Sequence, residues 1–327
     1  MRNSFTRRTA IRAIGGLAAL PATGALAQSP WPSRTITIIH GFPAGGPSDI
    51  ISRLLADGLS RALGQAVIVE SRPGASGTVA AALVARGVPD GYTLSVIPSG
   101  HASAAATFAS LPYRSVDDFT TISLASEYPY VMATHMDSGI KSVAELIATA
   151  KKRPNSLLYG TPGVGSGPQL AIELFALETK IKVTHVPYRG SAPAVMELLA
   201  GRLDFMMDPP ATMMEFIGNG KLRVLAVSSA KPYFALPSAP TIAESGVSGF
   251  DVSGWQGLIA PAGLPEPILK RLNAEAVRIL KDPATVERMH TFGNEASPST
   301  PAEFKKRLID DIAKWTAVAE QIHFEKI

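Results

Sequence analysis

The chain has 327 residues, of which 46% are hydrophobic and none is cysteine. This length is typical of a globular protein of two domains, and the lack of thiols excludes disulfides, thiol catalysis and thiolate metal sites. The formal net charge is +4, but residues 1–27 hold four of the 31 basic residues and no acidic one. The remainder has 27 basic and 27 acidic residues, so it lacks the basic excess that binding to nucleic acid or to an anionic membrane requires.

The N-terminus has the three parts of a secretory signal peptide. Four arginines precede or open an alanine-rich apolar run over 14–25, and the run ends in the small-residue pattern Ala25-Leu26-Ala27. The run is shorter than the roughly 20 residues that span a bilayer. We predict a signal peptide over 1–27, cleavage after Ala27 and export to the bacterial periplasm, by the general secretory route or, given the pair Arg7-Arg8, by the twin-arginine route.

The mature chain begins with alternating strand and helix patterns. Runs rich in β-branched residues predict strands over 35–40, 66–70 and 93–97, and apolar residues at helical spacing predict helices over 49–63, 78–86 and 101–109. Such alternation is typical of a parallel, doubly wound sheet, whose strand-to-helix loops all lie at one edge.

A second set of elements begins near Tyr128. A capping-box pattern at Ser142 and Glu145 opens a helix, and further helices are predicted over 167–177 and 192–199, with strands over 157–159, 182–185, 203–207 and 222–227. An extended run over 250–260 leads to a helix from Pro265 to about 281, and Thr300 opens a last helix. We predict two lobes joined by two crossings, with lobe 1 over 28–128 and 258–327 and lobe 2 over 129–257.

Two glycine-rich turns each join a predicted strand to a predicted helix. The first contains Gly45 and Gly46, and no Lys or Arg lies between His40 and Ser52. Glycine lets the backbone approach a guest closely, and the free N–H groups of the helix start, with Ser48 or Asp49 as cap candidates, suit an anion. An ordinary steric role for the glycines is the alternative.

The second turn, Tyr159 to Pro168, repeats these features with Thr161 or Ser166 as the cap candidate. Two such turns predict a clamp for a small carboxylate or phosphate. A third strand-to-helix turn has Ser191 as the expected cap, and Tyr188 either lines the ligand or lies in a surface loop. Asp208 follows a strand and either accepts a hydrogen bond from a ligand or forms a turn.

Motifs of the major enzyme classes are missing from the sequence. The dinucleotide fingerprint, the P-loop and the G-x-S-x-G elbow all fail, and the six histidines show no metal-binding spacing. We therefore predict no catalytic residue, no cofactor and no metal. An exported hydrolase or isomerase stays open as the alternative, with Ser166 or Asp208 as catalyst and His101 or His185 as base.

The chain resembles the solute receptors of tripartite tricarboxylate transporters, the Bug-type periplasmic binding proteins. The resemblance covers nearly all of the mature chain, and its motifs include Phe42-Pro-Ala-Gly-Gly46, Arg72-Pro-Gly74, Pro89-Asp-Gly-Tyr-Thr-Leu94, Tyr159-Gly160, His185-Val-Pro-Tyr188 and Trp255 with Gly257-Leu258. It implies an α/β fold of the periplasmic binding protein-like class (type II), with two doubly wound lobes, a hinge and a ligand cleft between the lobes.

The resemblance also implies a non-catalytic receptor that binds a small organic carboxylate and feeds membrane permease subunits, as a monomer. An orphan sensory receptor is a further alternative. Family site positions map onto a set of residues in the two loops and the cleft: Phe42, Ala44, Gly45, Gly46, Asp49, Ser99, Gly100, Thr161, Gly163, Gly165, Ser166, Tyr188 and Asp208. Gln169 and Arg189 depart from the family pattern, which leaves the distal end of the ligand open.

Overall fold

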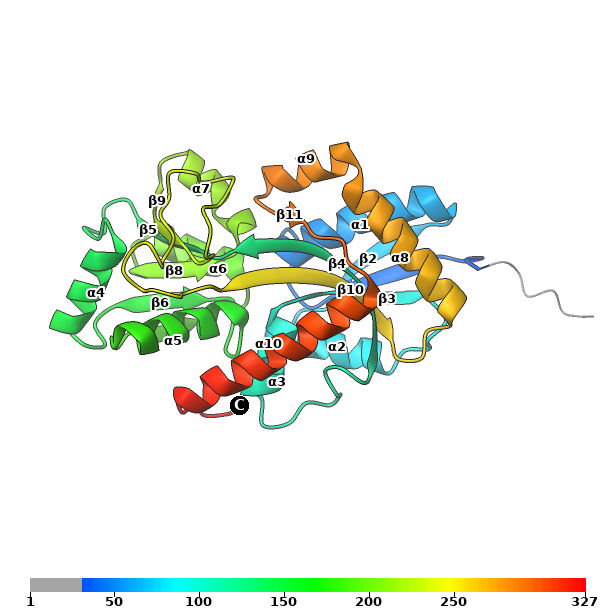
Figure 1. Ribbon diagram of the computed structural model, residues 1–327, viewed down its shortest axis with the longest axis horizontal. Coiled ribbons are helices and arrows are strands. Elements are labelled where there is room, and N and C mark those ends of the chain that lie inside the picture. The colour runs from blue at the N-terminus through cyan, green and yellow to red at the C-terminus, as the bar shows by residue number, and fades with distance from the viewer. Residues whose placement is uncertain (1–30) are drawn as a thin grey trace, which may run out of the picture. The chain divides into compact units, whose positions relative to one another are not determined.

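Two mixed β-sheets, each flanked by helices, make up the fold of residues 32–327 (Figure 1). The structure is a computed structural model and describes residues 31–327. The predicted signal peptide and its cleavage site lie outside the described residues. Within the described part of the chain, no helix is long and apolar enough to cross a membrane.

The first sheet has six strands in the order β11-β4-β10-β3-β1-β2. Strand β1 is parallel to β2 and β3, as predicted, but β10 is antiparallel to β3 and β4. The parallel arrangement predicted for the first three strands is confirmed, and the sheet as a whole is mixed because β4 leads out to the second sheet and β10 leads back from it, so the two run in opposite directions. The strands are β1 (Ile36–His40), β2 (Val67–Ser71), β3 (Thr93–Pro98), β4 (Phe119–Pro129), β10 (Ser253–Pro261) and β11 (Glu295–Ala296).

The second sheet has five strands in the order β7-β6-β8-β5-β9. Strand β6 is parallel to β7 and β8, whereas β5 is antiparallel to β8 and β9. This sheet is therefore mixed as well. Its strands are β5 (Val131–His135), β6 (Leu158–Thr161), β7 (Thr184–Pro187), β8 (Phe205–Asp208) and β9 (Leu222–Val227).

The predicted helices all form, with ends that differ by a few residues. The long closing helices pack on the first sheet as predicted, α10 along α3 and β4, and α8 along α1 and β4 (Figure 1). Strands β4, β5 and β11 and helices α7 and α9 were not predicted. The helices are α1 (Pro47–Leu63), α2 (Thr78–Ala85), α3 (Gly100–Thr107), α4 (Val143–Lys152), α5 (Gly167–Thr179), α6 (Ser191–Leu199), α7 (Met214–Gly218), α8 (Glu266–Lys281), α9 (Pro283–Thr291) and α10 (Pro301–Gln321).

The chain passes between the sheets at Tyr130 and again over 228–252. Ser228 joins the two passages, because its Oγ accepts from Tyr130 N (2.8 Å) and donates to Val252 O (2.6 Å). Backbone bonds from Ser228 N to Tyr130 O and from Val252 N to Ser228 O complete the junction. The predicted lobe boundaries stay a prediction, since residues 32–327 form one unit of continuous contacts.

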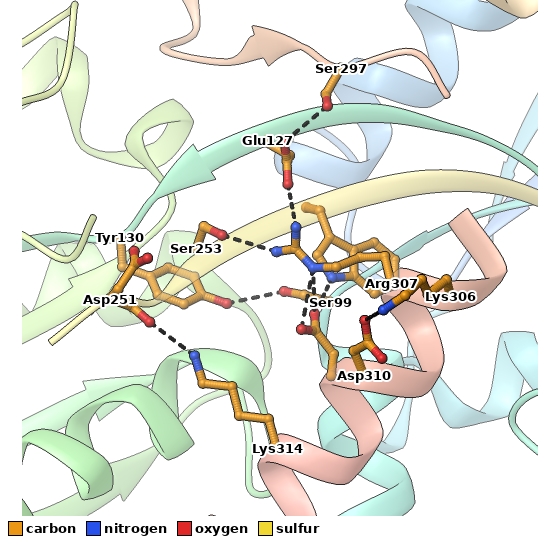
Figure 2. A network of polar contacts seen from close by, with 12 residues as sticks. Ser99, Glu127, Tyr130, Asp251, Ser253, Ser297, Lys306, Arg307, Asp310 and Lys314 are labelled. Carbon is orange, nitrogen blue, oxygen red and sulfur yellow. Dashed lines mark hydrogen bonds and ion pairs between the residues drawn. The ribbon is translucent and has the colours of Figure 1, made fainter. Parts of the chain in front are cut away.

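Arg307 of α10 ties both long strands together next to this junction (Figure 2). Its Nη1 donates to Glu127 Oε1 of β4 (2.5 Å) and its Nη2 to Ser253 Oγ at the start of β10 (3.0 Å). Asp311, one turn further along α10, accepts from Arg307 Nε and from Trp255 Nε1. Helix α10 therefore fixes the ends of the strands that connect the two sheets.

Candidate functional site

Four helices begin at one deep cavity between the two sheets. Helices α1 and α3 belong to the half of the fold that contains the first sheet, and α5 and α6 belong to the half that contains the second. The cavity has a volume of about 50 Å³, and no charged side chain of the described residues lines it. Its walls are formed by Phe42, Pro47, Ser48, Ser76, Pro98, Ser99, Gly100, Tyr128, Tyr130, Pro162, Ser166, Gly167, Pro168, Ser191, Pro209 and Gln256.

None of these four helix starts is capped by a side chain. Helices α2, α7 and α8 also lack side-chain caps, whereas the caps of α4, α9 and α10 are Ser142, Asp282 and Thr300, and each accepts from the backbone three residues on. The first N–H groups of a helix have no partner within the helix. The uncapped starts therefore present donors and the positive end of the helix dipole to the cavity.

The predicted caps of α1 and α6 are wrong. Gly46 and Gly190 occupy the cap positions, and Ser48 and Ser191 lie inside the first turns of their helices. Thr161 lies in β6, where its hydroxyl contacts His185 Nε2 at 2.6 Å. Ser166 is the cap residue of α5, but its hydroxyl makes no hydrogen bond and is buried. The helix starts at the cavity thus lack the side-chain caps that the sequence predicted.

Asp49 and Gln169 fix the two glycine-rich loops in the same way. Asp49 Oδ2 accepts from Gly45 N (2.9 Å) and Gln169 Oε1 accepts from Gly165 N (2.7 Å), each pair four residues apart. Both glycines have a left-handed backbone, with φ of +79° at Gly45 and +74° at Gly165. These side chains hold the loop backbone that leads into α1 and α5.

The Asp49 carboxylate is shared with two further groups. It contacts His40 Nε2 (3.1 Å) and accepts from Arg53 Nε (2.9 Å). Burial opposes ionisation of Asp49, but the bonds from Arg53 and from Gly45 N outweigh it and hold the pKa of the carboxyl below its usual value. Burial also lowers the pKa of His40. Asp49 is therefore an ionised structural group that turns away from the cavity.

A larger cavity of about 760 Å³ adjoins the deep one and shares Phe42, Ser76 and Pro162 with it. Its walls are mainly proline, aromatic and aliphatic side chains, including Pro43, Phe108 and Val164. Arg189, which departs from the family pattern, lies on its wall and is exposed.

The loops of the two halves touch each other around these cavities. Ser76 Oγ donates to Val164 O (2.7 Å) and Ser103 Oγ donates to Gly165 O (2.8 Å). A Cβ at Gly163 would lie 2.8 Å from Ser76 Oγ, and one at Gly165 would lie 2.5 Å from Thr107 Oγ1. Glycine at 163 and 165 therefore permits contact between the two halves of the fold.

The structure brings together only part of the predicted site. Phe42, Ser99, Gly100 and Ser166 line the deep cavity, and Gly163 and Tyr188 line the larger one. The remaining predicted residues line neither cavity: Ala44, Gly45, Gly46, Asp49, Thr161, Gly165 and Asp208. That any of these residues contacts a ligand stays a prediction.

Sequence reasoning missed Ser76, Tyr128, Tyr130 and Gln256 as wall residues. Gln256 gave a usable signal, because it is a polar residue inside the otherwise apolar strand run from Trp255 to Ala260. The tyrosines gave none, since an aromatic residue next to a strand is most often part of a core.

Asp208 is fully buried next to the cavity residues Pro209 and Ser191. Its Oδ2 accepts from Thr212 Oγ1 (2.7 Å), while Oδ1 has no hydrogen bond of regular geometry. Burial raises the pKa of Asp208 to about 7, although the hydroxyls of Ser191 and Thr212 favour the ionised form. The carboxyl is thus a buried group with a pKa of about 7, and its bond to Thr212 joins it to the turn that follows β8.

The residues proposed for catalysis are not arranged as a nucleophile and its base. His101 Nε2 bonds Ser115 O (2.9 Å) and His185 Nε2 contacts Thr161, and neither histidine lines the deep cavity. Burial lowers the pKa of both histidines to about 4. Among residues 31–327, no cluster of three or more His, Asp or Glu side chains is placed to hold a metal ion.

Comparison with known proteins agrees with this geometry. The sequence pattern of the family described as "Tripartite tricarboxylate transporter family receptor" matches residues 51–324. Three solved structures are similar to this chain over nearly their whole length. They are an R. palustris protein with adipate (33% identity, TM-score 0.88, 91% of this chain and 100% of that one), the periplasmic binding protein BugD (30%, 0.85, 91% and 100%) and MatC from Rhodopseudomonas palustris with bound malate (32%, 0.83, 88% and 99%).

The fold is that of a periplasmic binding protein, with two α/β halves around a ligand cleft. The chain belongs to the tripartite tricarboxylate transporter receptor family. It is a solute-binding receptor of the Bug type.

Proposed function

We propose that this receptor binds a small organic carboxylate in the deep cavity and delivers it, chemically unchanged, to permease subunits in the membrane. The observation that carries the proposal is the convergence of four uncapped helix starts on a buried, uncharged cavity. Similar proteins solved with adipate and with malate support the carboxylate. The signal-peptide pattern over 1–27 supports a periplasmic location.

The interactions available in the cavity are sufficient for useful affinity. Each helix terminus contributes about 0.3–1 kcal/mol to an exposed charge and up to about 2 kcal/mol to a partly buried one. A hydrogen bond to a charged group adds about 1.5–3 kcal/mol. Micromolar affinity requires about 8 kcal/mol, so four termini and a few N–H bonds reach it without an arginine.

Substitution of Gly100 by Ala tests the location of the site. Gly100 is at the start of α3, and a Cβ there would meet only ordinary contacts, at 3.9 Å from Gly167 N and from Pro98. The methyl group would occupy space between the starts of α3 and α5. We expect Gly100→Ala to fold with a Tm at or above that of the wild type and to lose at least tenfold in carboxylate affinity by calorimetry.

Gly218→Ala is the matched control, because Gly218 lies in α7 and a Cβ there meets nothing within 4 Å. This variant should bind as the wild type does. Equal affinity of the wild type and Gly100→Ala would place the ligand elsewhere. Mass spectrometry of the released ligand tests the second half of the proposal, since a chemically altered product would mean that the protein is an enzyme.

A further inference from the structure

Gln256 carries two buried polar atoms at the wall of the deep cavity. The residue lies within β10 and is 0% exposed. Neither Oε1 nor Nε2 has a hydrogen bond of regular geometry, although the Tyr128 hydroxyl is close enough to interact with the amide. Buried polar atoms in native proteins are nearly always paired with protein, water or a guest. The Tyr128 hydroxyl can accept from Nε2, so it is the buried Oε1 without a partner that points to a group that enters the cavity.

The chemistry of an amide limits what that group can be. Gln256 offers a donor at Nε2 and an acceptor at Oε1, whereas an ionised carboxylate only accepts. A carboxylate alone would leave Oε1 without a partner. A hydroxyl group both donates and accepts, so it can pair with Oε1 and still receive a bond from a neighbouring donor. An ammonium group would also satisfy Oε1, but it would face the positive ends of four helices.

The size of the cavity places this group close to the carboxylate. A buried water occupies roughly 10–15 Å³ of such volume, so a cavity of about 50 Å³ holds about three to five waters. That space suits a short carbon chain. Gln256 lies in β10 of the first sheet, and Ser166, whose buried hydroxyl is also unpaired, lies at the start of α5 in the other half, so the cavity is lined from both halves.

We propose that Gln256 is a specificity residue that recognises a hydroxyl group, and that the ligands of this receptor are short hydroxycarboxylates. The inference rests on the proposed function and narrows it. It goes beyond the helix starts, because those recognise negative charge and cannot distinguish a hydroxy acid from the same acid without its hydroxyl.

The test uses pairs of acids that differ by one hydroxyl group, namely malate with succinate and lactate with propionate. Calorimetry on the wild type should show tighter binding of the hydroxy acid in at least one pair, by about tenfold. Gln256→Leu should bring the two affinities of that pair within about twofold while the unsubstituted acid still binds. Gln256→Met gives the same measurement if the leucine variant does not fold. Aspartate, with an ammonium group in place of the hydroxyl, should bind more weakly than malate.

Asn273→Leu is the matched control, because the Asn273 amide donates to Ile122 O (2.8 Å) and Ser299 O (2.9 Å). It should lower the Tm and leave the selectivity unchanged, whereas Gln256→Leu should keep the Tm and change the selectivity. An unchanged preference in both Gln256 variants, no preference in the wild type, or tighter binding of aspartate than of malate would overturn the inference and leave the proposed function intact. If the wild type binds no carboxylate at all, the proposed function itself fails.

Discussion

Individual glycines in the two loops have different tasks. Gly163 and Gly165 lie where the second half of the fold meets Ser76 and Thr107 of the first half. A Cβ added at Gly190 would lie 3.3 Å from Pro43. Gly100 has room around it at the cavity wall. From the sequence, we expected the loop glycines either to allow close approach of a guest or to have an ordinary steric role in the turn. The structure shows that close approach of the protein to itself explains those at 163, 165 and 190.

Asp208 gives the protein a specific dependence of stability on pH. Its pKa is about 7 in the folded state against a usual 3.8, so between these values the folded state retains a proton that the unfolded state has lost. Stability from this group is fully present below pH 3.8 and is lost as the pH rises through 7. The total effect is on the order of 4 kcal/mol, at 1.36 kcal/mol for each pH unit.

Asp208→Asn should remove this dependence. We expect Asp208→Asn to gain stability relative to the wild type when the pH is raised from 4 to 8. Urea unfolding of both proteins at both pH values measures this gain. His101 and His185 have the opposite pH dependence, because their pKa values are lowered to about 4. They reduce stability as the pH falls from 6.5 through 4. That loss is common to both proteins and cancels. Parallel pH profiles would show that Asp208 is ionised throughout.

At the scale of elements, the helices at the deep cavity share uncapped starts that meet at one place. Helices α2, α7 and α8 are uncapped as well, but they do not begin at this cavity, whereas α4 and α10 have Ser142 and the full capping box of Thr300 and Glu303. A missing cap costs about 0.5–2 kcal/mol. The cost is smaller for α1 and α6, because glycine occupies their cap positions. Under the proposed function, a ligand that accepts from the free N–H groups would offset it.

Asp49 and Gln169 are expected to support binding without contacting the ligand. Loss of the bond to Gly45 N or Gly165 N should loosen the loop that presents a helix start. We expect Asp49→Ala and Gln169→Ala each to weaken carboxylate binding by roughly three- to tenfold in calorimetry. Asp49→Ala should also lower stability by about 1.5–3 kcal/mol, since it removes hydrogen bonds to a charged group.

Asp57→Ala is the control for this pair, because Asp57 lies in the same helix and only approaches Arg288 at 3.7 Å. Its binding and stability should match those of the wild type. Wild-type affinity in both loop variants would mean that the loop backbone holds its shape without these side chains.

For the whole molecule, the junction between the sheets lies next to the binding cavity. Tyr130 takes part in the junction through its backbone and lines the cavity with its ring, where its hydroxyl contacts Ser99 Oγ at 3.1 Å (Figure 2). Tyr128 and Gln256, on the paired strands β4 and β10, line the same cavity. If the ligand binds in this cavity as proposed, it contacts the strands that connect the two halves, and this contact would couple binding to hinge closure.

Arg307→Ala should loosen this connection. The change leaves Glu127 and Asp311 without their cation, and the side chains involved are 13–35% exposed, so we expect a loss of about 1–3 kcal/mol in urea unfolding. Lys306→Ala is the control, because Lys306 pairs with Asp310 at a site where its side chain is 76% exposed (Figure 2). A loss no greater in Arg307→Ala than in Lys306→Ala would show that α10 is not a structural tie.

Local signals in the sequence located most elements and the family. Alternating strands and helices, the patterns at Ser142 and Thr300, and the ordered family motifs depend on neighbouring residues, and the structure and the family match confirm them. Strand β4 was missed for a physical reason. It pairs with β10 across more than 120 residues, and no local pattern in the sequence indicates such a pairing.

The sequence by itself determined a two-part α/β receptor with glycine-rich turns before its helices. The tertiary structure alone decided which groups line the cavities. It turned Asp49 toward Gly45 and Arg53, placed Gly163 against Ser76, and brought Gln256 and Tyr130 to the cavity wall. The reason is that turn geometry is a local property of the chain, whereas the wall of a cavity between two sheets is made by residues that meet only when the whole fold is assembled.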